Sequence, residues 1–191
     1  MQIILASSSP YRRALLERLG LAFRYAAPSL DEMPHNGETP QIMVRRLARA
    51  KVQTVATRYA GSIIIGSDQV AALDGVILGK PGSHERAVAQ LTALSGQSVL
   101  FFTGLCVLDT RTQQSQEHLD QTRVRFRSLS AAEVEHYLYA EQPYNCAGSF
   151  KSEGLGIGLL ESVESQDPTA LIGLPLITLC RFLREAGVAL P

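Results

Sequence analysis

The chain has 191 residues, and its 18 basic and 18 acidic side chains leave no formal net charge at pH 7. This balance excludes a general electrostatic footprint for nucleic acid or for an anionic membrane, so any anion site must be local. No apolar stretch approaches the roughly 20 residues of a transmembrane helix, and we expect no signal peptide. Three cysteines without metal-ligand spacing indicate reduced core thiols. We therefore expect a cytoplasmic protein with one large domain or two closely joined lobes.

The first predicted element is a short apolar strand at residues 3–5, which precedes three serines. Ser9 and Pro10 predict a helix start, because the fixed φ of proline suits the first helical turn. Gly20 predicts the end of this helix.

The serines at 7–9 place hydroxyl and amide groups at this helix N-terminus, where an anion is favoured. Arg12 and Arg13 occupy the first turn, where a helix disfavours cations. A multiply charged anion would offset this cost. The alternative is an ordinary N-cap with solvated arginines.

A loop rich in turn formers and acids is expected at residues 28–40. It contains Asp31 and Glu32, whose hard oxygens magnesium accepts beside phosphate and water, although solvated loop acids are the alternative. Thr39 then opens a helix whose apolar stripe includes or adjoins Lys51. The lysine either passes the edge of the core to reach solvent or directs its ammonium into a cleft between helix and sheet.

Residues 62–81 predict a buried strand, a break at Gly66 and Ser67, and a hairpin that turns at 74–75. Asp68 then lies just beyond the strand, where α/β folds bind ligands. A carboxylate there could activate water as a base. The alternative is an aspartate that only bonds its own turn.

The later elements favour a mixed α/β fold, because strands and helices are interleaved and adjacent hairpins argue against a purely parallel sheet. A helix is expected at residues 83–95, and a large hairpin at 99–128 with an irregular polar tip at 110–117. A capping box opens another helix at residue 130, and the last helix is expected at 175–187. We expect two lobes around a groove.

Lys80, on the far side of the hairpin that Asp68 begins, could return to the same edge. Residues 145–159 concentrate small side chains, so they predict either close backbone approach to a ligand or a tight loop. Leu159 stands at the third glycine position of a dinucleotide-binding motif, and no Walker A pattern occurs, so neither phosphate-binding motif is supported. Residues 167–176 are interpreted as mainly structural.

Six motifs together resemble the Maf family of nucleoside triphosphate pyrophosphatases, in this order and over nearly the full length: LASSSPYRR, SLDE, IIGSDQV, GKP, CAGSFKSEGLGI and DPTALIGLPL. The resemblance implies a single domain over residues 1–191, with a mixed, strongly curved sheet, flanking helices and two lobes around a deep cleft, as in ITPase-like proteins. It also implies a homodimer, and a reaction that depends on magnesium, with manganese as an alternative. The products would be a nucleoside monophosphate and pyrophosphate.

The same resemblance assigns roles to individual residues. Asp68 matches the general base that deprotonates water for attack at the α-phosphorus, while Glu32 and the substrate phosphates help to hold the metal. The division of base and metal duties between these two carboxylates stays open. The substrate contacts would be Ser7, Ser9, Tyr11, Arg12, Arg13, Lys51, Gln69, Lys80, Lys151 and Glu153.

The sequence resembles the branch of the family that prefers 7-methyl-GTP at three of these positions, although that branch most often has tryptophan where this chain has Tyr11. Tyr11, Gln69 and Glu153 stand where the branch acting on dTTP or UTP has arginine, threonine and glutamine. An aromatic face attracts the cationic methylated guanine, and a carboxylate accepts from its N1–H and N2–H₂ groups. The alternatives are the same chemistry on dTTP or UTP, and a non-catalytic regulator of septation.

Overall fold

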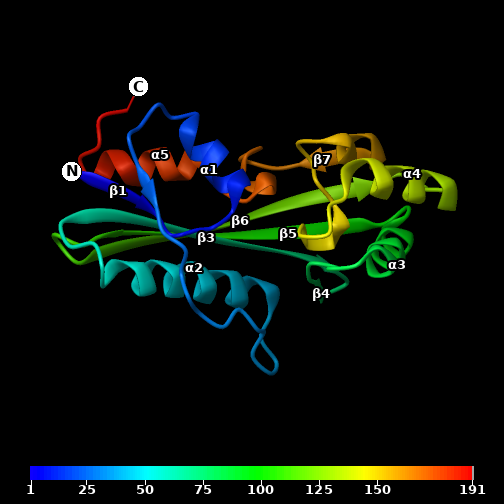
Figure 1. The fold of residues 1–191 in the computed structure, drawn as a ribbon, viewed down its shortest axis with the longest axis horizontal. Coiled ribbons are helices and arrows are strands. Elements are labelled where there is room, and N and C mark those ends of the chain that lie inside the picture. Colours follow the sequence, from blue (N-terminus) through cyan, green and yellow to red (C-terminus); the bar gives the residue numbers. More distant parts are fainter. Residues whose placement is uncertain (191) are drawn as a thin grey trace. The chain divides into compact units, whose positions relative to one another are not determined.

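The computed structural model describes residues 1–190. Over these residues the protein is a mixed α/β fold, with a seven-stranded sheet and five α-helices (Figure 1). The strands are β1 (Gln2–Leu5), β2 (Arg24–Tyr25), β3 (Ser62–Leu73), β4 (Val76–Leu78), β5 (Ser98–Asp109), β6 (Gln114–Phe126) and β7 (Leu160–Glu164). The helices are α1 (Pro10–Glu17), α2 (Pro40–Ala56), α3 (His84–Leu94), α4 (Ala131–Glu141) and α5 (Leu176–Glu185). The expected mixed α/β fold is confirmed.

The sheet is open, with the strand order β2-β1-β3-β5-β6-β7 and with β4 paired to β3. Strand β1 runs parallel to both β2 and β3, and Ile3 lies opposite Ile63. In contrast, the β3–β4 and β6–β7 pairs are antiparallel. The sheet is therefore mixed, as the adjacent hairpins predicted.

Two compact units divide the chain, and each has its own core. Unit 1 consists of residues 1–68, 103–120 and 167 onward, and unit 2 consists of residues 69–102 and 121–166. Two units agree with the expectation of two lobes. The single domain and the deep cleft implied by the family resemblance stay predictions.

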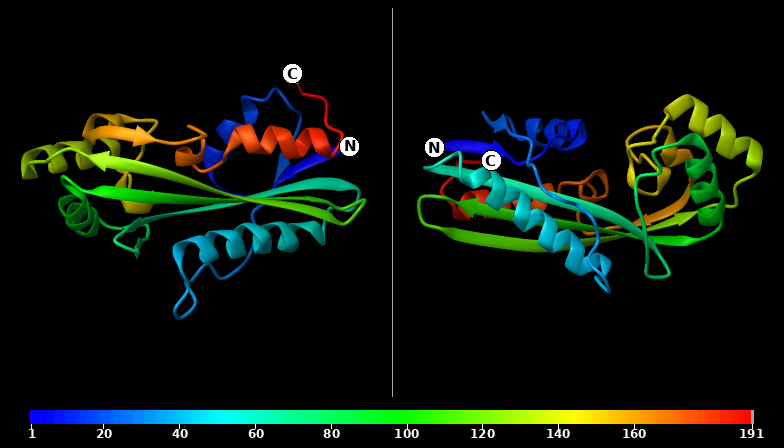
Figure 2. Two further views of the ribbon diagram at one scale, coloured as in Figure 1. Left: turned by 180° about the vertical axis from the view of Figure 1, so that it is seen from behind. Right: turned by 60° about the horizontal axis from the view of Figure 1, so that its bottom comes forward.

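In unit 1 the strands carry apolar side chains on both faces, because helices cover both faces of the sheet there (Figures 1 and 2). Ile3 and Ile63 belong to a core cluster with leucines of α1 and α5. Ile4 and Ile64 alternate with them and pack instead with α2. The run of apolar residues at 63–65 therefore reflects a strand buried from two sides.

The predicted break at Gly66 and Ser67 is wrong, because β3 continues through both residues. Gly66 allows the close approach of α2: a Cβ there would lie 2.6 Å from the carbonyl oxygen of Ala48. Gly104 has the same role on β5, where a Cβ would overlap the carbonyl oxygen of Val44. These glycines set how closely α2 lies on the sheet.

Three buried aromatic rings pack together in unit 2: the ring centroid of Phe150 lies 5.9 Å from that of Phe101 and 5.4 Å from that of Phe126. The predicted capping box is present, with Ser130 and Glu133 exchanging hydrogen bonds at the start of α4. The polar tip of the large hairpin is shorter than predicted, because β6 already begins at Gln114.

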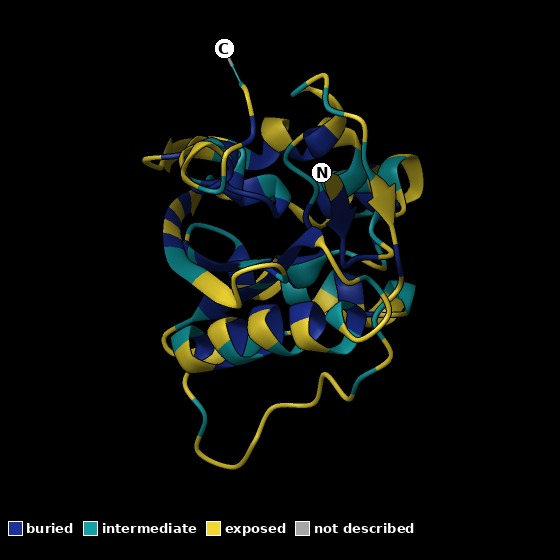
Figure 3. Cartoon of the chain, turned by 90° about the vertical axis from the view of Figure 1, so that its left-hand side faces the viewer, coloured by how far each residue is buried: buried dark blue, intermediate teal, exposed yellow. Residues whose placement is uncertain are grey.

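Most residues of the central strands are buried, whereas the helices alternate between buried and exposed residues, as the colours of Figure 3 show. The loop between β2 and α2, which contains Glu32, is mostly exposed. Of the cysteines, only Cys106 is buried, and burial raises the pKa of its thiol to about 12; Cys146 and Cys180 are partly exposed. The expectation of core thiols therefore holds for one residue of three. Within residues 1–190, no helix is long and apolar enough to cross a membrane.

Candidate active site

The turn between β1 and α1 has the capping geometry that its sequence predicts. Ser9 is the N-cap of α1, and its Oγ accepts a hydrogen bond from the backbone N–H of Arg12 at 3.4 Å. The buried Ser7 accepts in turn from the N–H of Ser9 at 3.1 Å. Pro10 follows at the first helical position. The two serines thus fix the shape of the turn, while their contact with an anion stays a prediction.

Arg12 projects from this first turn into a cluster of charges. Its Nε donates a hydrogen bond to the carbonyl oxygen of Gly173 at 2.8 Å. Burial lowers the pKa of the Arg12 guanidinium, and the negative charges of Asp68 and Glu32 oppose this shift. Because arginine stays protonated in proteins, a permanent positive charge faces both carboxylates.

Lys51 joins the same two carboxylates by direct contact. Lys51 as a whole is 4% exposed, and its Nζ lies 2.5 Å from Oδ1 of Asp68 and 2.8 Å from Oε1 of Glu32. Asp68 is buried at 7% exposure, whereas about half of the Glu32 side chain, 47%, is exposed. The ammonium therefore turns toward Asp68 on the sheet instead of passing out to solvent, while the role of Lys51 in binding substrate stays a prediction.

Ser67 fastens the strand beside this cluster. Its fully buried Oγ lies 2.8 Å from the carbonyl oxygens of both Gly104 and Gly173. The carbonyl of Gly173 therefore contacts both Ser67 and Arg12. Residues 167–176, interpreted from sequence as mainly structural, thus also hold a charged residue of the candidate site.

The two neighbours of Arg12 in the sequence lie differently. The guanidinium carbon of Arg13 lies 4.5 Å from the centre of the Tyr25 ring, so this cation is directed at β2. Tyr11 is partly buried in the first turn of α1. Of the two predicted arginines, the structure brings only Arg12 to Asp68 and Glu32.

The other predicted substrate contacts lie in unit 2. Gln69 directly follows Asp68 on β3, and Lys80 is exposed after β4. The carbonyl of Gly79, next to Lys80, accepts hydrogen bonds from the N–H of Gly148 at 3.4 Å and from Nε2 of Gln90 at 3.1 Å. The GKP turn therefore lies against the segment 145–159, which carries Lys151 and Glu153.

Lys151 and Glu153 differ in their surroundings, although they are two residues apart. The Nζ of Lys151 lies 2.6 Å from Oε1 of Glu141, and its side chain is a quarter exposed. Glu153 is exposed and accepts a hydrogen bond from the hydroxyl of the adjacent Ser152 at 3.3 Å. Glu141 was not among the residues singled out from the sequence.

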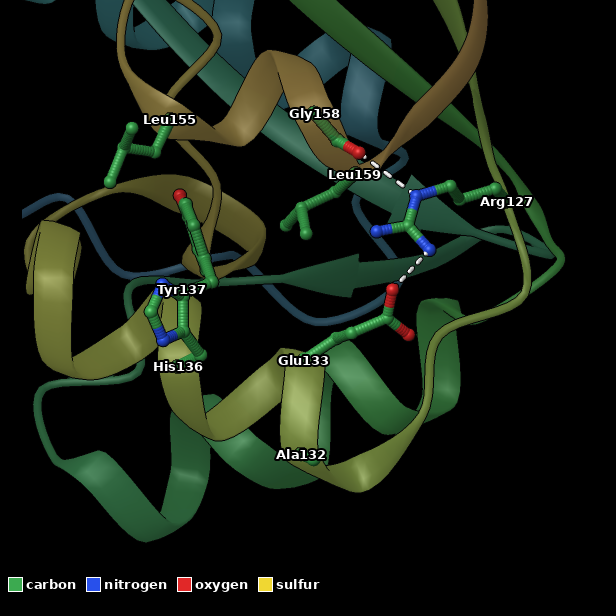
Figure 4. A pocket seen from close by; sticks show the side chains of 8 residues that line it. All are labelled: Arg127, Ala132, Glu133, His136, Tyr137, Leu155, Gly158 and Leu159. Carbon is green, nitrogen blue, oxygen red and sulfur yellow. Dashed lines mark hydrogen bonds and ion pairs between the residues drawn. The ribbon is translucent and has the colours of Figure 1, made fainter.

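Unit 2 also contains a cavity of about 380 Å³ between α4 and the segment that follows Gly154 (Figure 4). An ion pair between Arg127 and Glu133 closes one side of it at 2.7 Å. Its lining residues are Arg127, Ala132, Glu133, His136, Tyr137, Leu155, Gly158 and Leu159. None of the predicted site residues lines this cavity.

The model of a family described as Maf-like protein matches residues 2–186. The chain belongs to the Maf family. Three relatives carry the name 7-methyl-GTP pyrophosphatase. The relative from Ralstonia nicotianae is 57% identical over 96% of this chain and 94% of its own length. The relative from Polaromonas sp. is 55% identical over 98% of this chain and 86% of its own length. The relative from Alcanivorax borkumensis is 51% identical over 99% of this chain and 96% of its own length.

A divalent metal would find only part of its ligands in this Maf chain. Within residues 1–190, no group of three or more His, Cys, Asp and Glu side chains could hold a metal ion. Glu32 and Asp68 do converge on one ammonium, so both carboxylates can reach a common cation. Two hard oxygen donors fit magnesium when phosphate and water oxygens supply the remainder.

Sequence reasoning did not single out three residues that contact the candidate site residues. Ser67 was interpreted as part of a strand break and Gly173 as part of a structural turn, because Gly173 lies 106 residues from Ser67 and 161 residues from Arg12 in the sequence. Glu141 did carry a signal: it is the last residue of α4, where the helix dipole disfavours an anion.

Proposed function

We propose that this protein is a nucleoside triphosphate pyrophosphatase that hydrolyses 7-methyl-GTP to 7-methyl-GMP and pyrophosphate. The observation that carries the proposal is the contact of one buried ammonium, Lys51, with the carboxylates of Asp68 and Glu32, beside the cation of Arg12. Such a cluster combines a base with positive charge for phosphates. The shared name of the three relatives supports the substrate.

Asp68 is proposed as the general base. Its carboxylate would take a proton from water while the water oxygen forms a bond to the α-phosphorus. The bond to the oxygen that bridges the α- and β-phosphorus atoms breaks, and its electrons leave with pyrophosphate. Lys51, 2.5 Å from Oδ1, holds the carboxylate in place during this transfer.

Positive charge is proposed to stabilise the leaving pyrophosphate. Arg12 and Lys80 would bind the triphosphate and gain strength as charge moves onto the leaving group. Glu32 and Asp68, with phosphate oxygens, would hold magnesium or manganese, which when bound withdraws charge from the phosphates. The serines of the β1–α1 turn would complete the phosphate contacts.

The base of the nucleotide is proposed to be recognised by Tyr11, Gln69 and Glu153. The cationic ring of 7-methylguanine suits the aromatic face of Tyr11. The exposed carboxylate of Glu153 can accept from the N1–H and N2–H₂ groups of guanine. Uracil and thymine offer no such pair of donors, so this set favours the methylated purine.

A homodimer in the cytoplasm is also proposed, in line with the family resemblance. Light scattering of the purified protein at micromolar concentration tests the assembly. A mass of twice 20.8 kDa is expected, and a monomer mass over the whole concentration range would contradict the dimer.

Hydrolysis in ¹⁸O-labelled water tests the proposed chemistry. Attack at the α-phosphorus places one ¹⁸O in 7-methyl-GMP and none in pyrophosphate, which mass spectrometry of both products distinguishes. Release of 7-methyl-GDP with labelled orthophosphate, or label in pyrophosphate, would contradict the proposed bond cleavage. Absence of product with every nucleotide would favour a non-catalytic regulator.

A further inference from the structure

Glu141 is a largely covered carboxylate in an unfavourable place. It is the last residue of α4, where the negative end of the helix dipole repels an anion. Its side chain is only 10% exposed, and a buried charge is costly unless it is paired and hydrogen-bonded. A carboxylate at this position therefore needs a compensating role.

Each oxygen of Glu141 binds a different part of one segment. Oε1 lies 2.6 Å from the ammonium of Lys151, and Oε2 accepts from the backbone N–H of Leu155 at 2.7 Å. Burial raises the pKa of Glu141, but the bonds from Lys151 and from the Leu155 N–H outweigh it, so the net shift is downward. The ionised carboxylate thus bridges residues 151 and 155.

A second residue of α4 holds the same segment. Tyr137, one helical turn before Glu141, accepts a hydrogen bond from the backbone N–H of Lys151 at 3.1 Å. Lys151 is therefore fixed through its backbone by Tyr137 and through its side chain by Glu141.

Gly154 shows how closely the segment approaches this carboxylate. A Cβ at Gly154 would overlap the carboxyl group of Glu141. The backbone φ of Gly154 is −119°, so a glycine is needed here for space and not for a left-handed conformation. Glu153 lies between the two anchored positions, Lys151 and Leu155.

We infer that Glu141 is a positioning residue for purine recognition: it clamps residues 151–155 to α4 and so determines where Glu153 presents its carboxylate. This inference rests on the proposed role of Glu153 in binding the guanine edge. It gives Lys151 its function through Glu141, since the ion pair fixes one end of the segment. A loosened clamp would leave phosphate binding intact and weaken discrimination between bases.

The substitution Glu141→Ala removes both acceptors and tests the clamp. The kcat/KM for 7-methyl-GTP is expected to fall about tenfold, the scale of one lost hydrogen-bonding contact, while that for UTP changes less than about twofold. Hydrogen exchange of the Leu155 amide should accelerate by a similar factor. Glu141→Gln keeps an oxygen that can accept from the Leu155 N–H, so its kcat/KM for 7-methyl-GTP should fall less. Lys151→Arg keeps the ion pair with Glu141 and should retain the preference for 7-methyl-GTP over UTP.

Glu161→Gln is a matched control, because Glu161 forms an ion pair of similar length, 2.7 Å, with Arg125 on the exposed surface of unit 2. This variant should keep the wild-type ratio of kcat/KM for 7-methyl-GTP to kcat/KM for UTP. Equal losses on both nucleotides in Glu141→Ala, or unchanged exchange at Leu155, would overturn the inference alone. A wild-type protein without turnover of any nucleotide would instead overturn the proposed function, and the role in discrimination with it.

Discussion

Asp68 is the residue on which the proposed chemistry depends most. The substitution Asp68→Asn keeps the size of the side chain but removes the base, so turnover should fall by roughly 10²-fold or more. Nucleotide binding should change little, because Arg12 and Lys80 remain. Steady-state kinetics and equilibrium binding of 7-methyl-GTP measure the two effects separately.

The control for this substitution is Glu117→Gln, which breaks a surface ion pair with Arg49 in unit 1. This variant should retain wild-type turnover, since exposed pairs contribute little to stability. A folded Asp68→Asn protein with wild-type turnover would remove Asp68 from the mechanism.

Glu153 is the residue expected to choose the base. In Glu153→Gln the amide NH₂ would face the donors of guanine, and a donor that the bound base covers and leaves unmatched costs about 1–3 kcal/mol. The kcat/KM for 7-methyl-GTP should therefore fall roughly ten- to a hundredfold, and far less for UTP. Tyr11→Ala should add a loss specific to the methylated purine. Equal losses across 7-methyl-GTP, GTP, UTP and dTTP would refute this assignment.

Some residues of the candidate site could be predicted from the sequence because their signals are local. Ser9 before Pro10 marks a helix start, and the position of Lys51 on an apolar stripe marks it as partly buried. The contact of Ser67 with Gly173 could not be predicted in this way. It joins residues 106 positions apart, and no periodicity reports such a contact.

At the scale of elements, the seating of α2 on the sheet depends on two glycines. Gly104→Ala would place a methyl group against the backbone of Val44, which cannot yield as a flexible side chain could. Overpacking of this kind should lower the free energy of unfolding by about 1–3 kcal/mol or more. Urea denaturation measures the change, with Gly158→Ala as the control, because a Cβ at Gly158 meets no atom within 4 Å. Equal stabilities of the two variants would contradict this account of the packing.

The loop that carries Glu32 is fastened to α2 by Arg46. Its guanidinium binds both oxygens of Glu38, at 2.6 and 2.7 Å, and the carbonyl of Met33 at 3.1 Å. The hydrogen bonds from Arg46 hold the pKa of Glu38 at about 2, below its ordinary value. These contacts fix residues on both sides of the turn at 36–37.

This depressed pKa predicts a pH dependence of stability. A carboxyl with a lowered folded-state pKa stabilises the protein above its unfolded pKa of about 4.3, and this contribution is lost as pH falls toward 2. Glu38→Gln should therefore be less stable than the wild type at pH 7, and the difference should shrink between about pH 4 and pH 2. Urea unfolding at pH 7, 5 and 3 measures it. A difference that stays constant over this range would contradict the assigned pKa.

The ends of helices and strands could be predicted where the sequence has clear capping residues. They were predicted less well where a residue is needed for packing between elements. Caps at Ser9, Thr39 and Ser130 predicted three helix starts correctly. Gly66 misled because glycine commonly ends a strand, whereas here it makes room for α2. The polar tip of the large hairpin misled because exposed strand residues can be as polar as a loop.

At the scale of the whole molecule, periodicity predicted the mixed α/β class, but the family resemblance implied the architecture in detail. The net charge of the chain is zero, and the site cluster has the same balance, since the cations of Arg12 and Lys51 face the carboxylates of Asp68 and Glu32. Each unit is held by its own core, and the predicted nucleotide contacts are divided between the two. Their division is why no single local motif identified the full set.

The most direct test of the proposed function is pyrophosphate release by the wild-type protein in magnesium, measured as kcat/KM for 7-methyl-GTP, GTP, UTP and dTTP. We predict that 7-methyl-GTP is preferred over the two pyrimidine nucleotides by at least about tenfold, since the proposed base site matches only the methylated purine. Equal or higher kcat/KM for UTP or dTTP would contradict the base assignment. No pyrophosphate from any of the four would contradict the enzymatic function itself.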